Sequence, residues 1–186
     1  MNKIILASGS PRRKELLERA SIDFIIDASS IDETLDESLP LKQRLQKLAI
    51  DKALPIHHKY PNDIVIAADT IVYFQNQIIG KAKNEKEARF ILNSLSNKKH
   101  SVYTSVAIYF QDELETFIDQ TDVYFKDIHL LIDSYIASGE WKGKAGAYGI
   151  QGSADCFVDH IEGDIDNVIG LPLKKVVDIL KKRSCI

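Results

Sequence analysis

Residues 8–14, Ser-Gly-Ser-Pro-Arg-Arg-Lys, gather groups that bind anions at the expected start of a helix. The free backbone N–H groups and the positive dipole end of a helix N-terminus favour phosphate. Gly9 lets the backbone approach a ligand closely, and Ser8 adds a hydroxyl. Arg12 and Arg13 offer paired N–H groups to phosphate oxygens. The alternative is a solvated basic turn, and no Gly-x4-Gly-Lys-Ser/Thr string marks a Walker A motif.

Two acidic positions supply oxygens of the kind that hard cations prefer. Asp69 and Thr70 directly follow the apolar run 64–68, so the carboxylate is expected at the end of a buried strand. Open α/β sheets place their ligands at such strand ends. Asp32 and Glu33 lie in a polar loop, and with Asp69 they would suit Mg²⁺ or Mn²⁺. The alternatives are a turn-capping aspartate and a solvated acidic loop.

Two lysines lie where they could reach the same ligand. Lys81 follows Gly80 at an expected strand end, although it also fits a plain hairpin end. Lys52 lies on the inner edge of a helix that is expected to end before Pro55. A lysine in that place more often extends its amine to solvent than takes part in catalysis.

Residues 143–152 repeat glycine every third position, four times. This is far too short for collagen and too poor in large side chains for a core element. We interpret it as a backbone-rich loop that could wrap a flat ligand, with Gln151 as its amide reader. A flexible surface connection is the alternative.

The elements that must position these residues alternate between strand and helix. The pattern favours one α/β domain over 1–186, with a mixed, strongly bent β-sheet, flanking helices and two lobes formed where a long hairpin bends the sheet. Expected strands span 3–7, 23–26, 64–68, 71–74, 78–79, 101–110, 114–125 and 156–161. Expected helices begin near 11, 41, 84, 129 and 172, and residues 166–172 are expected to form a turn.

The composition excludes several classes of protein. The 186 residues are 45% hydrophobic and 27% charged, which is typical of a globular domain. A formal net charge of −3 argues against general nucleic-acid binding. No apolar run approaches the ~18 residues of a membrane span. The apolar run between Lys3 and Ser8 is too short for a signal-peptide core. Two cysteines form no disulfide framework or zinc motif, so we expect a cytoplasmic protein.

Taken together, these segments closely resemble the Maf family of nucleoside triphosphate pyrophosphatases. Asp166 departs from the family, which more often has serine or another residue there. The matching strings occur in family order across nearly the whole chain: Leu6 to Arg13 with Leu16-Leu17, Asp32-Glu33-Thr34, Lys52-Ala53, Ala68-Asp69-Thr70 with Val72, Gly80-Lys81, Lys144 to Gly152 and Gly170-Leu171-Pro172.

The resemblance implies a mixed-sheet α/β fold with a deep cleft between two lobes, shared in outline with inosine-triphosphate pyrophosphatases. It also implies a divalent cation (Mg²⁺ or Mn²⁺) and a homodimer. It implies hydrolysis of a nucleoside triphosphate between its α- and β-phosphates, to remove non-standard nucleotides from the precursor pool. Asp69 would accept a proton from the attacking water, and Glu33 would join it in binding metal. The residues that would hold the phosphates and the departing pyrophosphate are Ser8, Arg13, Lys52 and Lys81.

Three positions sort the subgroups of this family, and here they are Arg12, Thr70 and Gln151. The subgroup that acts on 7-methyl-GTP carries tryptophan, glutamine and glutamate there, so this chain resembles the subgroup acting on dTTP and UTP. A glutamine amide can accept from N3–H of uracil or thymine and donate to a neighbouring carbonyl. The family was also first linked to inhibition of septum formation, so the alternative is a cell-division regulator that acts by binding protein or nucleotide.

Overall fold

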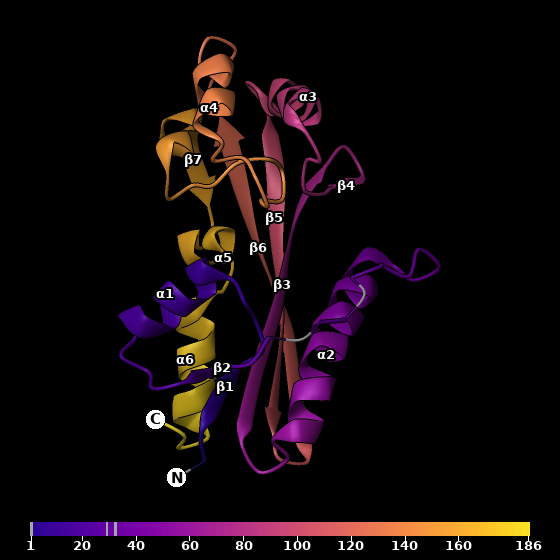
Figure 1. Ribbon diagram of the computed structural model, residues 1–186, viewed down its shortest axis with the longest axis vertical. Helices are drawn as coiled ribbons and strands as arrows, with labels where there is room; N and C mark the ends of the chain where they lie inside the picture. The colour runs from indigo at the N-terminus through magenta and orange to yellow at the C-terminus, as the bar shows by residue number, and fades with distance from the viewer. Residues whose placement is uncertain (1, 29, 32) are drawn as a thin grey trace. The chain divides into compact units, whose positions relative to one another are not determined.

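The computed structural model describes residues 2–28, 30–31 and 33–186, and Figure 1 shows the path of the chain. Strands and helices alternate along most of the sequence. In chain order the elements are β1 (Ile4–Leu6), α1 (Pro11–Arg19), β2 (Ile25–Ile26), α2 (Leu41–Lys59), β3 (Ile64–Phe74), β4 (Gln77–Ile79), α3 (Glu85–Leu95), β5 (Lys99–Phe110), β6 (Glu113–Phe125), α4 (Ile132–Ser138), the 3₁₀ helix η1 (Ser153–Phe157), β7 (Val158–Glu162), α5 (Ile165–Ile169) and α6 (Leu173–Lys182).

Within the described ranges, seven strands form one mixed sheet, which confirms the predicted fold class. The strand order is β2-β1-β3-β5-β6-β7, and β4 pairs with β3 outside this path. Strand β1 runs parallel to both β2 and β3, whereas the β3–β4 and β6–β7 pairs are antiparallel. Strands β5 and β6 are neighbours joined by a turn at Gln111-Asp112, as the predicted hairpin requires.

The chain divides into two compact units, and β3, β5 and β6 each contribute residues to both. Unit 1 comprises residues 1–69, 104–119 and 170–186, and unit 2 comprises residues 70–103 and 120–169. The predicted cleft between two lobes stays a prediction.

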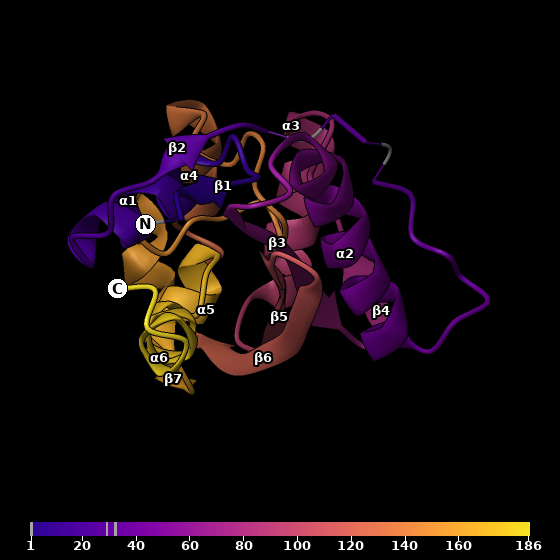
Figure 2. The same cartoon turned by 90° about the horizontal axis from the view of Figure 1, so that it is seen from below.

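In unit 1, helix α2 covers one face of the sheet, with α1 and α6 on the other side (Figures 1 and 2). The side chains under α2 are small or branched apolar residues, which let the helix approach the sheet closely. This core contains Ile5, Ala7, Ala49, Ala53, Ile56, Val65, Ala67 and Ala107.

Unit 2 has a second, more aromatic core. It includes Leu92, Leu95, Val123, Phe125, Tyr148 and Phe157. Helix α3 begins as its sequence predicts, because the Asn84 side chain accepts a hydrogen bond of 2.9 Å from the Glu87 N–H. Helix α4 ends at Gly139 with φ of +74°, which is also as predicted.

Three sequence-based predictions of local structure were wrong. Strand β3 continues through residues 69 and 70, so Asp69 does not lie at its end. Helix α2 continues past Pro55 to Lys59, because Ile56 packs in the core and the Tyr60 N–H bonds the Ile56 carbonyl. Packing of the final helical turn outweighs the single hydrogen bond lost at the proline.

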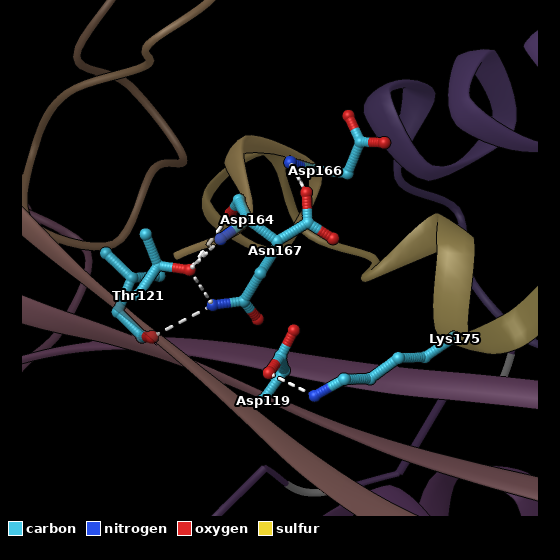
Figure 3. A network of polar contacts seen from close by, with 7 residues as sticks. Asp119, Thr121, Asp164, Asp166, Asn167 and Lys175 are labelled. Atoms are coloured by element: carbon cyan, nitrogen blue, oxygen red, sulfur yellow. Dashed lines mark hydrogen bonds and ion pairs between the residues drawn. The ribbon is translucent and has the colours of Figure 1, made fainter. Parts of the chain in front are cut away.

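The third concerns residues 166–172, where the structure has helix α5 instead of a simple turn. The buried Asn167 amide donates to Thr121 Oγ1 at 3.0 Å and to the Val102 carbonyl at 3.1 Å (Figure 3). Thr121 Oγ1 also donates to the Asp164 carbonyl at 2.9 Å. These bonds attach α5 to β5 and β6 within unit 2, a long-range stabilisation that local sequence does not show.

Candidate active site

Asp69 faces helix α2 because of the alternation of side chains along β3. Val65 and Ala67 pack under α2, and Asp69 is the next residue of that face. Strand β1 pairs with β3 only as far as Leu6 with Ile66, so the position of Asp69 lies beyond the end of β1. The prediction that Asp69 ends its own strand was wrong, and its carboxylate instead projects from the interior of β3.

Lys52 meets Asp69 from the helix side. It shares the buried face of α2 with Ala49, Ala53 and Ile56, and its side chain is 11% exposed. The ammonium Nζ lies 2.5 Å from Asp69 Oδ1. The apolar stem therefore packs in the core while the charge pairs with a carboxylate, which excludes the alternative of a lysine that reaches solvent.

Glu33 completes a three-residue cluster. Its Oε1 lies 2.9 Å from Lys52 Nζ, although half of its side chain is exposed. The carboxylates of Glu33 and Asp69 therefore both face one cationic point. Asp32, the other predicted acidic residue of this loop, lies outside the described residues.

Arg13 is held by two hydrogen bonds at the first turn of α1. Its Nε donates to the Gly170 carbonyl at 2.8 Å, and its Nη1 donates to Ser8 Oγ at 3.0 Å. The Ser10 N–H also donates to Ser8 Oγ, at 3.3 Å. Gly170 has φ of +135°, a conformation that favours glycine. The segment that is predicted to bind phosphate is therefore ordered by hydrogen bonds at Arg13 and Ser8.

The charges of these groups interact within unit 1. Burial of the Arg13 guanidinium lowers its pKa, the charges of Asp69 and Glu33 raise it, and the charge of Arg12 lowers it. The guanidinium stays charged near neutral pH, because arginine begins from so high a value. Arg13, Arg12 and the carboxylate cluster thus form one electrostatic site.

The remaining predicted residues belong to unit 2. Lys81 forms a β-bridge with Ala145, and the Gly146 N–H donates to the Gly80 carbonyl at 3.1 Å. The structure therefore brings Lys81 beside the glycine-rich loop that carries the exposed Gln151. Thr70 follows Asp69 in β3. The roles predicted for these three residues stay predictions.

The residues of the cluster fit a hard divalent cation. Mg²⁺ usually keeps several waters and is bound by one or two carboxylates together with substrate phosphates. Glu33 and Asp69 offer two carboxylates that converge on the Lys52 ammonium. No group of three or more His, Cys, Asp or Glu side chains that could hold a metal occurs among the described residues. Because a cation of this kind needs only one or two carboxylates from the protein, Glu33 and Asp69 suit a cation that a substrate helps to bind.

Sequence reasoning missed several supporting residues. Gly170 was recognised only as part of a matching string, and its contact with Arg13 spans 157 positions. His100, whose Nε2 lies 2.7 Å from Tyr148 Oη, gave no signal at all. Glu140 also gave none, although it bonds Ser153, the residue that directly follows the glycine-rich loop.

Fold and site together define an α/β protein with arginine, lysine and hydroxyl groups gathered beside paired carboxylates. The family described as "Maf-like protein" matches residues 3–183. The chain belongs to the Maf family.

Curated relatives match over almost the full length. A protein named dTTP/UTP pyrophosphatase from Bacillus cereus (strain AH187) is 48% identical over 183 residues, which cover 98% of this chain and 96% of that protein. A protein of the same name from Geobacillus sp. (strain WCH70) is 48% identical, over 98% of each chain. Among solved structures, a HAM1 protein from Coxiella burnetii matches with a TM-score of 0.52 and 16% identity, over 98% of this chain and 100% of that chain. This last likeness concerns the fold alone.

Proposed function

We propose that the protein is a nucleotide pyrophosphohydrolase that converts dTTP and UTP to the monophosphate and pyrophosphate. The observation that carries the proposal is the pairing of Lys52 with Asp69 and Glu33 in a unit that also orders Arg13. The names of the relatives support the substrate and favour the enzymatic function over a regulator that acts by binding.

In this proposal Asp69 accepts the proton of the attacking water. Lys52 engages Oδ1 of Asp69, which fixes the carboxylate, so we assign the proton to Oδ2. Arg13 and Ser8 hold phosphate oxygens, and Lys52 and Lys81 neutralise charge on the departing pyrophosphate. In such chemistry the protein contributes mainly positioning and electrostatic stabilisation.

Glu33 and Asp69 would hold a divalent cation, Mg²⁺ or Mn²⁺. When bound, such a cation polarises a phosphoryl oxygen and neutralises charge. Lys52 binds one oxygen of each carboxylate, so the cation would share Glu33 and Asp69 with the Lys52 ammonium.

Base selection is assigned to Arg12, Thr70 and Gln151. The Gln151 amide would accept from N3–H and donate to a carbonyl of uracil or thymine. Arg12 can only donate, which favours a base rich in oxygens. Within the cell, we propose that the enzyme acts in the cytoplasm as a homodimer, requires no nucleic acid and removes non-standard nucleotides. No helix within the described residues is long and apolar enough to span a membrane.

The direct test is to incubate pure protein with a panel of nucleoside triphosphates and Mg²⁺ or Mn²⁺ and to identify the products. Pyrophosphate and monophosphate from dTTP and UTP are expected, and Asp69→Asn should abolish their release. Release of orthophosphate alone, or full activity of the Asp69→Asn variant, would contradict the proposal.

A further inference from the structure

Glu140 binds the chain two residues beyond Gln151. Its Oε2 accepts a hydrogen bond of 2.9 Å from the Ser153 N–H, and its Oε1 accepts one of 2.8 Å from Ser153 Oγ. These two bonds hold the pKa of the Glu140 carboxyl below its usual value, so the acceptor is charged near neutral pH. Both oxygens of one carboxylate thus clamp one residue across 13 positions of sequence.

The segment before Gln151 is anchored separately. Tyr148 is buried against His100, with the two polar atoms 2.7 Å apart. The Gly149 N–H donates to Tyr135 Oη at 3.3 Å. After Gln151, the Glu140 carboxylate binds Ser153. The exposed Gln151 therefore lies between two hydrogen-bonded positions, Gly149 and Ser153.

Gly152 makes room for this clamp. A Cβ atom on Gly152 would lie 2.1 Å from Glu140 Oε2, well inside van der Waals contact. The backbone of Gly152, at φ −108° and ψ −152°, is extended and open to other residues. The restriction is therefore one of space, and a larger residue would displace the flexible Glu140 side chain rather than strain the backbone.

We propose that Glu140 is a positioning residue for base selection, whose carboxylate fixes the segment at Ser153 so that the Gln151 amide meets the base in one orientation. This inference rests on the proposed dTTP and UTP activity. Glu140 acts through Gln151 and need not touch substrate. If the Gln151 amide loses its orientation, its contacts to the pyrimidine weaken. Asp69 and Lys52, to which we assign the chemistry, are not affected.

The test compares kcat/KM for dTTP and for GTP in Glu140→Ala, Ser153→Ala and Glu140→Gln. Glu140→Ala should lower the dTTP-to-GTP ratio about tenfold, mainly through KM for dTTP, which is the scale of one lost directional contact. Ser153→Ala keeps the backbone bond to Glu140 and should lower the ratio less. Glu140→Gln should stay within about threefold of wild type, because its amide oxygen can accept from the Ser153 N–H and its NH₂ can donate to Ser153 Oγ. Glu162→Ala is the matched control, since this exposed carboxylate accepts a bond from Tyr124.

A double-mutant cycle of Gly152→Ala and Glu140→Ala tests the contact between these two residues. Gly152→Ala alone should reduce selectivity as Glu140→Ala does, because the added methyl displaces the carboxylate. In the Glu140→Ala background the same change should have little further effect. Thermal unfolding of each variant is measured alongside. If Glu140→Ala fails to fold, Gly152→Ala alone tests the proposal.

The outcomes separate the two proposals. If wild type shows no preference for dTTP, the proposed function fails and the inference fails with it. If wild type prefers dTTP but Glu140→Ala and Gly152→Ala keep the wild-type ratio, or lower dTTP and GTP turnover equally, the inference is overturned and the proposed function stands. Loss of selectivity in both variants, with retention in Glu140→Gln, supports it.

Discussion

The Lys52 ammonium lies 2.5 Å from Oδ1 of Asp69, at the contact of helix α2 with strand β3. Both side chains are almost enclosed, at 11% and 12% exposure. The pair is formed because each residue lies on the inward face of its element, where Ala49 and Ala67 let helix and strand approach closely. Removing one partner leaves a poorly hydrated charge, which is costly, whereas the intact pair adds little net stability.

Lys52→Met should therefore reduce both activity and stability. We expect kcat/KM for dTTP to fall at least a hundredfold, because Asp69 loses its fixed partner and the phosphates lose a cation. The free energy of unfolding should fall by about 1–3 kcal/mol, less than for a fully buried pair. Steady-state kinetics and urea denaturation measure the two effects.

The matched control for this prediction is Lys47→Met on the same helix. Lys47 pairs with Asp51 at 2.6 Å on the exposed side. Such exposed pairs contribute about 0–1 kcal/mol, so both quantities should stay close to wild type. Equal behaviour of the two lysine variants would contradict the assigned role of Lys52.

Arg13→Lys tests whether geometry or charge matters at the helix start. Arginine uses Nε for the Gly170 carbonyl and Nη1 for Ser8 Oγ, two separate donors of one planar group. A lysine ammonium cannot reproduce this fork. We expect a fall of roughly tenfold to a hundredfold in kcat/KM for dTTP, with Arg19→Lys, at the exposed end of the same helix, unchanged. Wild-type kinetics in Arg13→Lys would show that only charge is needed there.

His100 predicts a specific pH dependence of stability. Burial lowers the pKa of His100 to about 4, against a minor opposing effect of Asp122. As pH falls below about 6.5, the unfolded chain binds a proton that the folded chain rejects, so stability is full above that pH and is lost toward pH 4. Between pH 7 and pH 5 this one group should cost about 2 kcal/mol.

Urea denaturation of wild type and His100→Gln at several pH values measures this loss. The wild type should lose about 2 kcal/mol more than the variant between pH 7 and pH 5. Parallel curves for wild type and His100→Gln would mean that the histidine is not protected from protons in the folded protein.

Sequence patterns predicted the elements well where local signals were strong. Apolar runs marked β1 and the first half of β3, and Asn84 with Glu87 marked the start of α3. They failed at Pro55 and through Asp69-Thr70, where polar or helix-breaking residues continue an element because neighbouring packing holds them. Propensity describes a segment by itself, and tertiary contacts override it.

The same distinction applies to the site. Ser8, Arg13, Glu33, Lys52 and Asp69 were all predicted from residue type and family resemblance, and unit 1 brings them into two contact groups. The hydrogen-bond partners that orient such residues were not predictable, because no local pattern links Arg13 to Gly170 or Glu140 to Ser153. Such partners are set by the packed fold, so a single sequence indicates candidate site residues before it indicates the residues that orient them.

The identity of the base should depend on Arg12, Thr70 and Gln151. Glutamate in place of Gln151 would present two acceptors, which suit the adjacent N–H donors of guanine rather than the acceptor–donor–acceptor edge of uracil. Arg12→Trp, Thr70→Gln and Gln151→Glu together should therefore move preference from dTTP toward 7-methyl-GTP. An unpaired polar reader costs about 1–3 kcal/mol, which corresponds to roughly tenfold to a hundredfold per lost contact. The measurement is kcat/KM for dTTP, UTP, ITP and 7-methyl-GTP in wild type, in each single variant and in the triple variant. A wild type that prefers 7-methyl-GTP or ITP to dTTP would refute the three-residue assignment, although the pyrophosphatase proposal would remain.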